Sequence, residues 1–133
     1  MSFSKSRYNK NFEWEMIRES SKIGYLVIGG KGKLLKFFEK NFNPKSIISY
    51  SDKRFFNGNS YLKLGFELIK ETEPGYFYFK GLKRENRVKF QKHKLSTILE
   101  NFDSDLTEKE NMLNNGWRIV YDCGQKVFIK KYL

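Results

Sequence analysis

Several residue types are scarce or missing in this chain of 133 residues. It contains one cysteine, Cys123, and one histidine, His93. A lone cysteine excludes an intramolecular disulfide and a zinc site built on a cysteine cluster. A lone histidine excludes a histidine pair, so we expect no bound metal and no metal-dependent nuclease site in this chain.

Long hydrophobic runs are also missing. No stretch approaches the ~20 apolar residues of a membrane span, and no basic amphipathic helix with an aromatic face is evident. The opening residues, Met1–Arg7, lack the apolar core of a secretory signal. We therefore expect a cytoplasmic protein with no membrane partner.

Alanine is absent, whereas the 13 Phe and 8 Tyr indicate a globular chain. The length of the chain predicts a single domain over residues 1–133.

Acidic side chains are outnumbered. Lys and Arg total 26 against 15 Asp and Glu, which gives a formal charge of +11. Such a field attracts polyanions over about 8 Å at physiological salt. Nucleic acid, either DNA or RNA, is the polyanion that this balance favours.

The basic segment, Lys80–Lys94, concentrates this charge. Seven of its fifteen residues are Lys or Arg, opposed only by Glu85, and an aromatic stretch, Gly75–Phe79, precedes it. Cations can pair phosphates while aromatic rings stack on bases. The alternative is a solvated basic edge beside a core strand. The candidate nucleic-acid contacts are Arg54, Tyr76, Tyr78, Lys80, Lys83, Arg84, Arg87, Lys89, Lys92, His93 and Lys94.

Hydrophobic periodicity predicts alternating strands and helices in the first half. Residues 12–18 alternate with period two and predict a strand. A glycine-rich loop then leads into a helix that Asn43-Pro44 ends. Ser60 is the predicted N-cap of a short helix that Gly65 ends. Further strands are predicted at 46–51, 66–70 and 76–80, the last two around the turn Glu73-Pro74-Gly75.

The tail, residues 100–133, is predicted to form a helix and a β-hairpin. Thr107 and Glu110 have the spacing of a capping box. Residues 117–121 and 126–129 flank Asp122-Cys-Gly-Gln, which predicts the hairpin turn. Together these elements predict an α+β fold.

The loop between the first predicted strand and helix can bind an anion. Its glycines leave backbone N–H groups free at a helix N-terminus, where the dipole favours negative charge. It lacks the Walker spacing and the third glycine of a dinucleotide fingerprint. A tight turn without a ligand is the alternative. The candidate cofactor-binding residues are Ile28, Gly29, Gly30, Lys31, Gly32 and Lys33.

The element order and two motifs resemble the core of GNAT-type acyltransferases. The motifs are Gly30-Lys-Gly32 and Tyr61-Leu-Lys-Leu-Gly-Phe66. The resemblance implies a mixed sheet flanked by helices and acetyl-CoA or another acyl-CoA as the cofactor. Val27 stands where that family has Arg or Gln at the start of the loop, which weakens the case for cofactor binding.

A closer resemblance covers nearly the whole chain. The chain is similar to the C-terminal domain of phage homing endonucleases whose separate nuclease domain is of the very-short-patch-repair type, and to the GNAT-like phage DNA-modification protein Mom. The matching stretches include Trp14-Glu-x-Ile-Arg18, Ser49-Tyr-Ser-Asp-Lys-Arg54, Asn59–Phe66, Arg87-x-Lys-Phe-Gln-Lys-His-Lys-Leu95 and Tyr121-Asp-Cys-Gly124.

This resemblance implies that Arg18, Asp52 and Tyr61 lie at an active site. From the residues alone, Asp52 could equally cap the next turn or pair with Arg54, and Tyr61 could equally pack in the core. We expect no nuclease domain before residue 1, and we expect the sheet to begin at the third GNAT strand. A homodimer or a partner chain would then complete it.

Three functions follow as expectations. The first is a nucleic-acid-binding domain of the homing-endonuclease type, which contacts phosphates through the basic segment. The second is an acyl-CoA-dependent transferase that modifies a nucleobase or a lysine. The third is a phage anti-defence protein that binds a host nucleoprotein. A phage origin would place the protein in the host cytoplasm.

Overall fold

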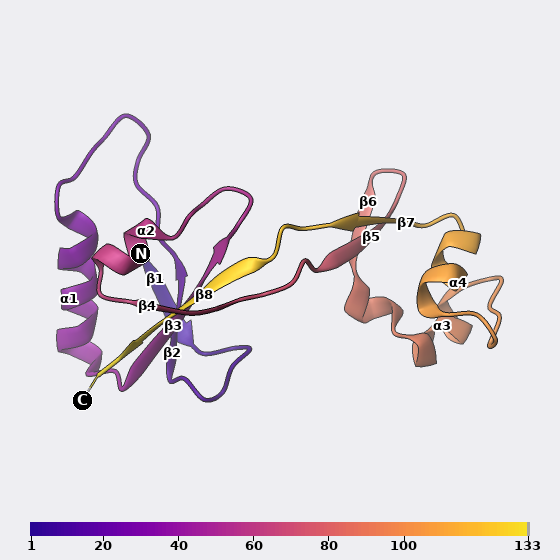
Figure 1. Ribbon diagram of the computed structural model, residues 1–133, viewed down its shortest axis with the longest axis horizontal. Helices are drawn as coiled ribbons and strands as arrows, with labels where there is room; N and C mark the ends of the chain where they lie inside the picture. Colours follow the sequence, from indigo (N-terminus) through magenta and orange to yellow (C-terminus); the bar gives the residue numbers. More distant parts are fainter. Residues whose placement is uncertain (133) are drawn as a thin grey trace. The chain divides into compact units, whose positions relative to one another are not determined.

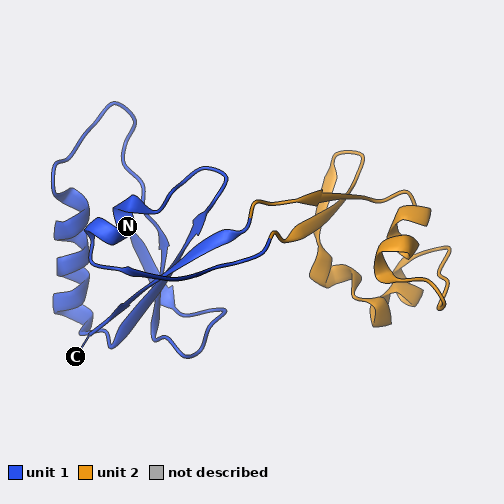
Figure 2. Cartoon of the chain, in the orientation of Figure 1, with its two compact units in different colours: residues 1–73, 124–133 blue, residues 74–123 orange. Residues whose placement is uncertain are grey.

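The computed structural model describes residues 1–132, which form two compact units (Figure 2). Unit 1 comprises Met1–Glu73 and the C-terminal segment from Gly124, and unit 2 comprises Pro74–Cys123. Each unit has its own sheet and its own helices, which confirms the predicted α+β class. No helix in the described part of the chain combines the length and apolar character needed to cross a bilayer.

Unit 1 contains a five-stranded mixed sheet in the order β1-β2-β3-β8-β4 (Figure 1). Only β2 and β3 run parallel, and α1 makes the connection between them. All other neighbours in this sheet are antiparallel. The elements are β1 (Ser2–Lys5), β2 (Trp14–Arg18), α1 (Gly30–Phe42), β3 (Ser46–Asp52), α2 (Asn59–Lys63), β4 (Glu67–Glu71) and β8 (Gln125–Lys131).

Helix α1 covers one face of this sheet because its apolar residues recur at helical spacing. Leu35 and Phe38 are buried against Met16, Ile47 and Phe128. The opposite face has a smaller buried cluster of Ile48, Val127 and Ile129. Burial on both faces explains why β3 and β8 are rich in apolar and β-branched residues.

The predicted N-cap of α2 is wrong. The cap is Gly58 with φ 86°, and Ser60 lies inside the helix. A Cβ built on Gly58 would lie 2.2 Å from Phe128 Cζ. Both the positive φ and the close approach of this ring therefore require glycine, and they override the intrinsic preference for serine at a cap.

Unit 2 contains a three-stranded antiparallel sheet in the order β6-β5-β7, with its helices beside it. Tyr78, Phe90, Leu95 and Met112 form its buried core. The predicted capping box is confirmed, because the Thr107 hydroxyl accepts from Glu110 N–H and the Glu110 carboxylate accepts in return. The elements are β5 (Tyr76–Lys80), β6 (Lys83–Asn86), the 3₁₀ helix η1 (Arg87–Phe90), α3 (Lys92–Ile98), α4 (Glu108–Asn114) and β7 (Arg118–Tyr121).

The predicted C-terminal hairpin is wrong. Strand β7 pairs with β5 in unit 2, whereas β8 pairs with β3 and β4 in unit 1. Likewise β4 and β5 belong to different sheets. The turn residues Glu73-Pro74-Gly75 and Asp122-Cys-Gly-Gln are the two places where the chain passes between the units. Unit 2 is thus an insertion between β4 and β8, with boundaries that differ from the predicted piece at 100–133.

Candidate functional site

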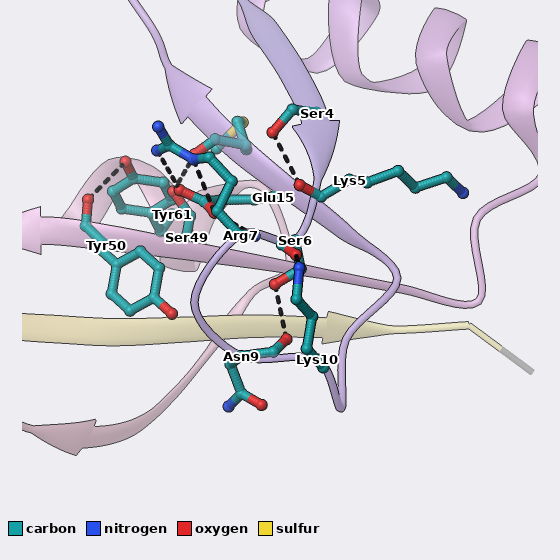
Figure 3. A network of polar contacts seen from close by, with 11 residues as sticks. Ser4, Lys5, Ser6, Arg7, Asn9, Lys10, Glu15, Ser49, Tyr50 and Tyr61 are labelled. Carbon is teal, nitrogen blue, oxygen red and sulfur yellow. Dashed lines mark hydrogen bonds and ion pairs between the residues drawn. The ribbon is translucent and has the colours of Figure 1, made fainter.

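Strands β2 and β3 pair only over their first halves. The parallel ladder joins Trp14 to Ile47 and Glu15 to Ile48. Beyond it, the buried Ser49 hydroxyl donates to Met16 O over 2.8 Å, so a side chain replaces the backbone ladder where the strands separate. This point is the strand fork, and Figure 3 shows Ser49 and Glu15 beside it.

A pocket of about 340 Å³ opens at the strand fork on the side of α2. It brings together the three predicted active-site residues, Arg18 at the end of β2, Asp52 at the end of β3 and Tyr61 on α2. Its other lining residues are Ile17, Glu19, Tyr50, Ser51, Phe56, Asn57, Gly58, Asn59 and Ser60. Three residues from distant parts of the sequence therefore share one pocket.

Two of these residues also have structural roles. Asp52 Oδ1 accepts from Arg54 N–H at 2.9 Å, which caps the turn after β3. The Tyr61 ring stacks on Phe128 with centroids 4.9 Å apart, and its hydroxyl lies 3.4 Å from Tyr50 O (Figure 3). Asp52 and Tyr61 are thus held in fixed positions by turn geometry and packing, and both remain on the pocket wall.

Sequence reasoning missed Ser51, which lines the same pocket. Its side chain is 3% exposed, and its hydroxyl has no hydrogen-bond partner among the described residues. Burying a hydroxyl without a partner costs roughly 1–3 kcal/mol. The sequence gives no sign that Ser51 lines a pocket, because a serine in a predicted strand can equally pack in the core. Only the separation of β2 from β3 at the strand fork distinguishes the two cases.

A second pocket of about 530 Å³ shares Ile17, Tyr50 and Asp52 with the first. It contains Glu15, which is 3% exposed and which forms an ion pair with Arg7 at 2.7 Å (Figure 3). Hydrogen bonds from Arg7 lower the pKa of Glu15 in spite of burial. Burial is the main cause that raises the pKa of Tyr50, and the negative charge of Glu15 adds to the shift. The sequence analysis did not single out Arg7, Glu15 or Tyr50 as site residues.

The glycine loop leads into α1 through a left-handed turn. Gly29 is the N-cap with φ 70°, and a Cβ on Gly30 would lie 2.8 Å from Val27 Cγ1. A tight turn therefore accounts for these two glycines. Gly32 differs, because a Cβ there meets nothing within 4 Å and its φ is not positive.

A carboxylate of the chain itself lies at this loop. Lys31 Nζ forms an ion pair with Glu19 and donates to Ser60 Oγ at 3.1 Å. An anionic ligand would have to compete with Glu19 for the lysine. Of the other predicted loop residues, Ile28 is 88% exposed and Lys33 is also exposed. A pocket of about 510 Å³ beside the loop is lined in part by Glu19, Tyr25, Val27, Gly30 and Lys31.

The predicted stacking residues face the core of unit 2. Tyr78 is fully buried, and its hydroxyl donates to Glu108 at 2.9 Å. Burial is the main cause that raises the pKa of Tyr78, and the hydrogen bond to Glu108 adds to the shift. Tyr76 is half-buried and bonds to the same carboxylate at 3.2 Å. Tyr78 is therefore excluded as a base-stacking residue, because its ring is already packed.

The basic segment spans the end of β5, β6, η1 and the start of α3. Lys83 and Lys89 both pair with Glu85 at 3.1 Å, and Lys80 Nζ donates to Asn115 O at 3.0 Å. Lys92, His93 and Lys94 are exposed at the start of α3. The arginines lie over aromatic rings, Arg84 over Phe77 at 4.8 Å and Arg87 over Tyr76 at 5.0 Å.

Arg54, the remaining predicted contact, belongs to unit 1. It lies 4.1 Å from the ring of Phe55, which is 63% exposed, and the neighbouring Phe56 is 66% exposed. Phe56 also lines the pocket at the strand fork. The segment from Arg54 to Phe56, here called the rim loop, thus presents one cation and two aromatic rings beside that pocket.

Within residues 1–132, no three His, Cys, Asp or Glu side chains lie close enough together to hold a metal ion. No protein-family model, curated protein or solved structure matches this chain.

Proposed function

We propose that the protein binds nucleic acid, as a domain of the homing-endonuclease type. The observation that supports this best is the distribution of charge. Unit 2 has nine Lys and Arg against seven Asp and Glu, so seventeen basic and eight acidic residues lie in unit 1. The excess positive charge is therefore carried mainly by the unit that has the strand fork and the rim loop.

Charge of this kind supports phosphate contacts, and the rim loop adds a place for an unstacked base. Phosphate neutralisation gives affinity that is independent of sequence, and exposed rings next to a guanidinium stack on bases. The proposal thus joins long-range attraction by unit 1 to local contact at Arg54, Phe55 and Phe56.

The test is fluorescence anisotropy with labelled duplex and single-stranded DNA over a range of salt. We expect affinity to fall steeply with salt, because bound cations release counterions. Arg54→Glu should weaken binding and reduce the salt slope by about 1. Lys40→Glu is the matched control, because Lys40 is exposed on α1 and its reversal changes the net charge equally. Equal effects of the two variants would argue against contact at the rim loop, and the absence of binding at low salt would overturn the proposal.

An acyl-CoA-dependent transferase is a second candidate, favoured by two observations. Arg18, Asp52 and Tyr61 were predicted from a resemblance, and all three line the pocket at the strand fork. The order β2, α1, β3, α2, β4 also agrees with the GNAT-like core that the resemblance implies. In this reading Tyr61 would supply a proton to the leaving thiolate, and the loop at α1 would hold the pyrophosphate.

Calorimetry with acetyl-CoA tests this second candidate. Gly32→Asp is the variant of choice, since a Cβ at Gly32 meets nothing and an acidic residue in the first turn stabilises a helix. We expect it to abolish binding by repelling the pyrophosphate, whereas the neutral Gly32→Asn should retain it. No heat with the unmodified protein at millimolar ligand would exclude cofactor binding.

A further inference from the structure

The sheet of unit 2 has an aromatic face that its core does not explain. Side chains alternate along β5, so Tyr76 and Tyr78 lie on one face, while Phe77 and Phe79 lie on the other. The tyrosine face packs on the core through Phe90 and Met112. Phe79 remains 36% exposed and Phe77 is half-buried. Antiparallel sheets ordinarily present polar residues on a solvated face, so these two rings call for another reason.

The pairing register places arginines on both sides of Phe79. Phe79 lies directly opposite Arg84 on β6 and Arg118 on β7. In the next row of the same face, Phe77 lies opposite Asn86 and Val120. Directly opposed residues share a face of the sheet. This face of the sheet, called the phenylalanine face below, therefore carries two rings in line, with a cation at each side of one of them.

Both arginines keep their charge available. Neither guanidinium forms an ion pair with a carboxylate of residues 1–132. Arg84 lies 4.8 Å over the ring of Phe77. Arg118 Nη1 donates to Trp117 O at 3.0 Å and to Leu113 O at 3.5 Å, both of them uncharged backbone carbonyls. By contrast, Lys83 and Lys89 already share Glu85.

We propose that the phenylalanine face binds single-stranded nucleic acid, with unstacked bases on Phe77 and Phe79 and phosphates at Arg84 and Arg118. The proposal rests on the proposed nucleic-acid binding and adds a second contact surface and a substrate class. Rings at i and i+2 of one strand are about 7 Å apart, which suits successive bases of an extended strand. Aromatic side chains on an open antiparallel sheet are a general means of holding unpaired bases.

A single strand fits this face better than a duplex or a protein. Bases in a duplex are stacked on one another, so their faces are closed to the two rings. A protein partner would need an acidic rim to match both arginines, and it would gain nothing from the spacing of the rings. Charge and stacking together therefore point to a strand with exposed bases.

Substitution at Phe79 tests the proposal in the full chain. A labelled oligothymidylate is titrated in an anisotropy assay, with a duplex of matched length alongside. We expect Phe79→Leu to weaken single-strand binding by about 5- to 100-fold, because stacking needs a π-face. Phe79→Trp should retain affinity, and its fluorescence should be quenched by the bound strand. The ring is partly exposed, so neither change should prevent folding, which circular dichroism checks.

The two arginines and an exposed ring on α1 supply the remaining comparisons. The double variant Arg84→Gln, Arg118→Gln should lower the salt slope on a single strand by about 1.4, at roughly 0.7 for each phosphate contact. Phe37→Leu is the control for loss of an exposed ring, because Phe37 is 67% exposed on α1 and lies outside both proposed contact surfaces. Unchanged single-strand binding in Phe79→Leu, with duplex binding intact, would overturn this inference and leave the proposed function standing. Loss of all nucleic-acid binding in the unmodified protein would overturn both.

Discussion

Gly58 shows how one residue can be constrained in two ways. Its positive φ disfavours any side chain, and the Phe128 ring occupies the space of a Cβ. We expect Gly58→Ala to lower the free energy of unfolding by about 2–4 kcal/mol. Urea denaturation measures this change.

Gly24 is the matched control for this prediction. Its φ is 82°, and a Cβ there meets nothing within 4 Å. Gly24→Ala should therefore cost only the backbone term of about 1 kcal/mol. Equal losses in both variants would show that the Phe128 ring moves aside without cost.

The buried Glu15 carboxylate makes stability depend on pH. Its pKa is lowered in the folded protein, chiefly by hydrogen bonds from Arg7. A lowered pKa stabilises the fold above the unfolded-state value of about 4.3, and the stabilisation is lost as pH falls through the folded-state pKa. Arg7→Met should therefore destabilise the fold at neutral pH, because it leaves the buried Glu15 carboxylate without its ion-pair partner.

Denaturation of Arg7→Met across pH 3 to 7 checks the sign. Its deficit should shrink as pH falls from about 4.3 through the lowered folded-state pKa of Glu15, below which the carboxyl is protonated in both proteins. Lys5→Met is the control, since Lys5 and Glu13 form an exposed ion pair that contributes little to stability. A deficit that persists at low pH would mean that Arg7 contributes by packing alone.

At the scale of the element, the cap of α4 can be tested separately. Thr107 and Glu110 satisfy each other's backbone N–H groups. We expect Thr107→Ala to cost about 1 kcal/mol, seen as lower hydrogen-exchange protection in α4. Thr97→Ala provides the comparison, because Thr97 lies within α3 and its hydroxyl donates to Lys94 O of the same helix. A similar loss at Thr97 would contradict the importance of the cap.

Local elements were predicted well from the sequence, and pairing was not. The period-two strand at β2, the helix that Asn43 ends and the capping box at Thr107 all depend on neighbours in sequence. In their local sequence, β7 and β8 resemble a hairpin, because they flank a turn at Gly124, whose φ is 75°. Their separation into two sheets depends on contacts with β5 and β3, which no local pattern encodes.

The faces of β5 could not be assigned from the sequence for a related reason. Tyr76 to Phe79 are all aromatic, so period two gives no contrast between the two faces. Only the register with β7 identifies Tyr78 as buried and Phe79 as exposed. Arg18, Asp52 and Tyr61 were predicted from a resemblance and line one pocket, whereas their role there stays a prediction. Arg7, Glu15 and Ser51 had no such signal.

At the scale of the whole molecule, unit 1 should fold without unit 2. Strands β4 and β8 remain paired up to the insertion, where Thr72 N–H donates to Gln125 O at 2.8 Å. A short glycine-serine turn in place of residues 74–123 would therefore close a hairpin. We expect this deletion variant to unfold cooperatively in urea. A non-cooperative transition, with a native transition for the full chain, would show that unit 1 depends on unit 2.

The position of unit 2 in the chain also determines an order of assembly during translation. Strand β8 pairs along the whole of β3, yet it leaves the ribosome only after residues 74–123. Until then β3, with Ile47 and Ile48, has an unpaired edge, and such edges attract other chains. Unit 2 is continuous in sequence and can complete its core first. The second unit of the nascent protein is therefore finished before the first, and a chain stalled before β8 would depend on chaperones to remain soluble.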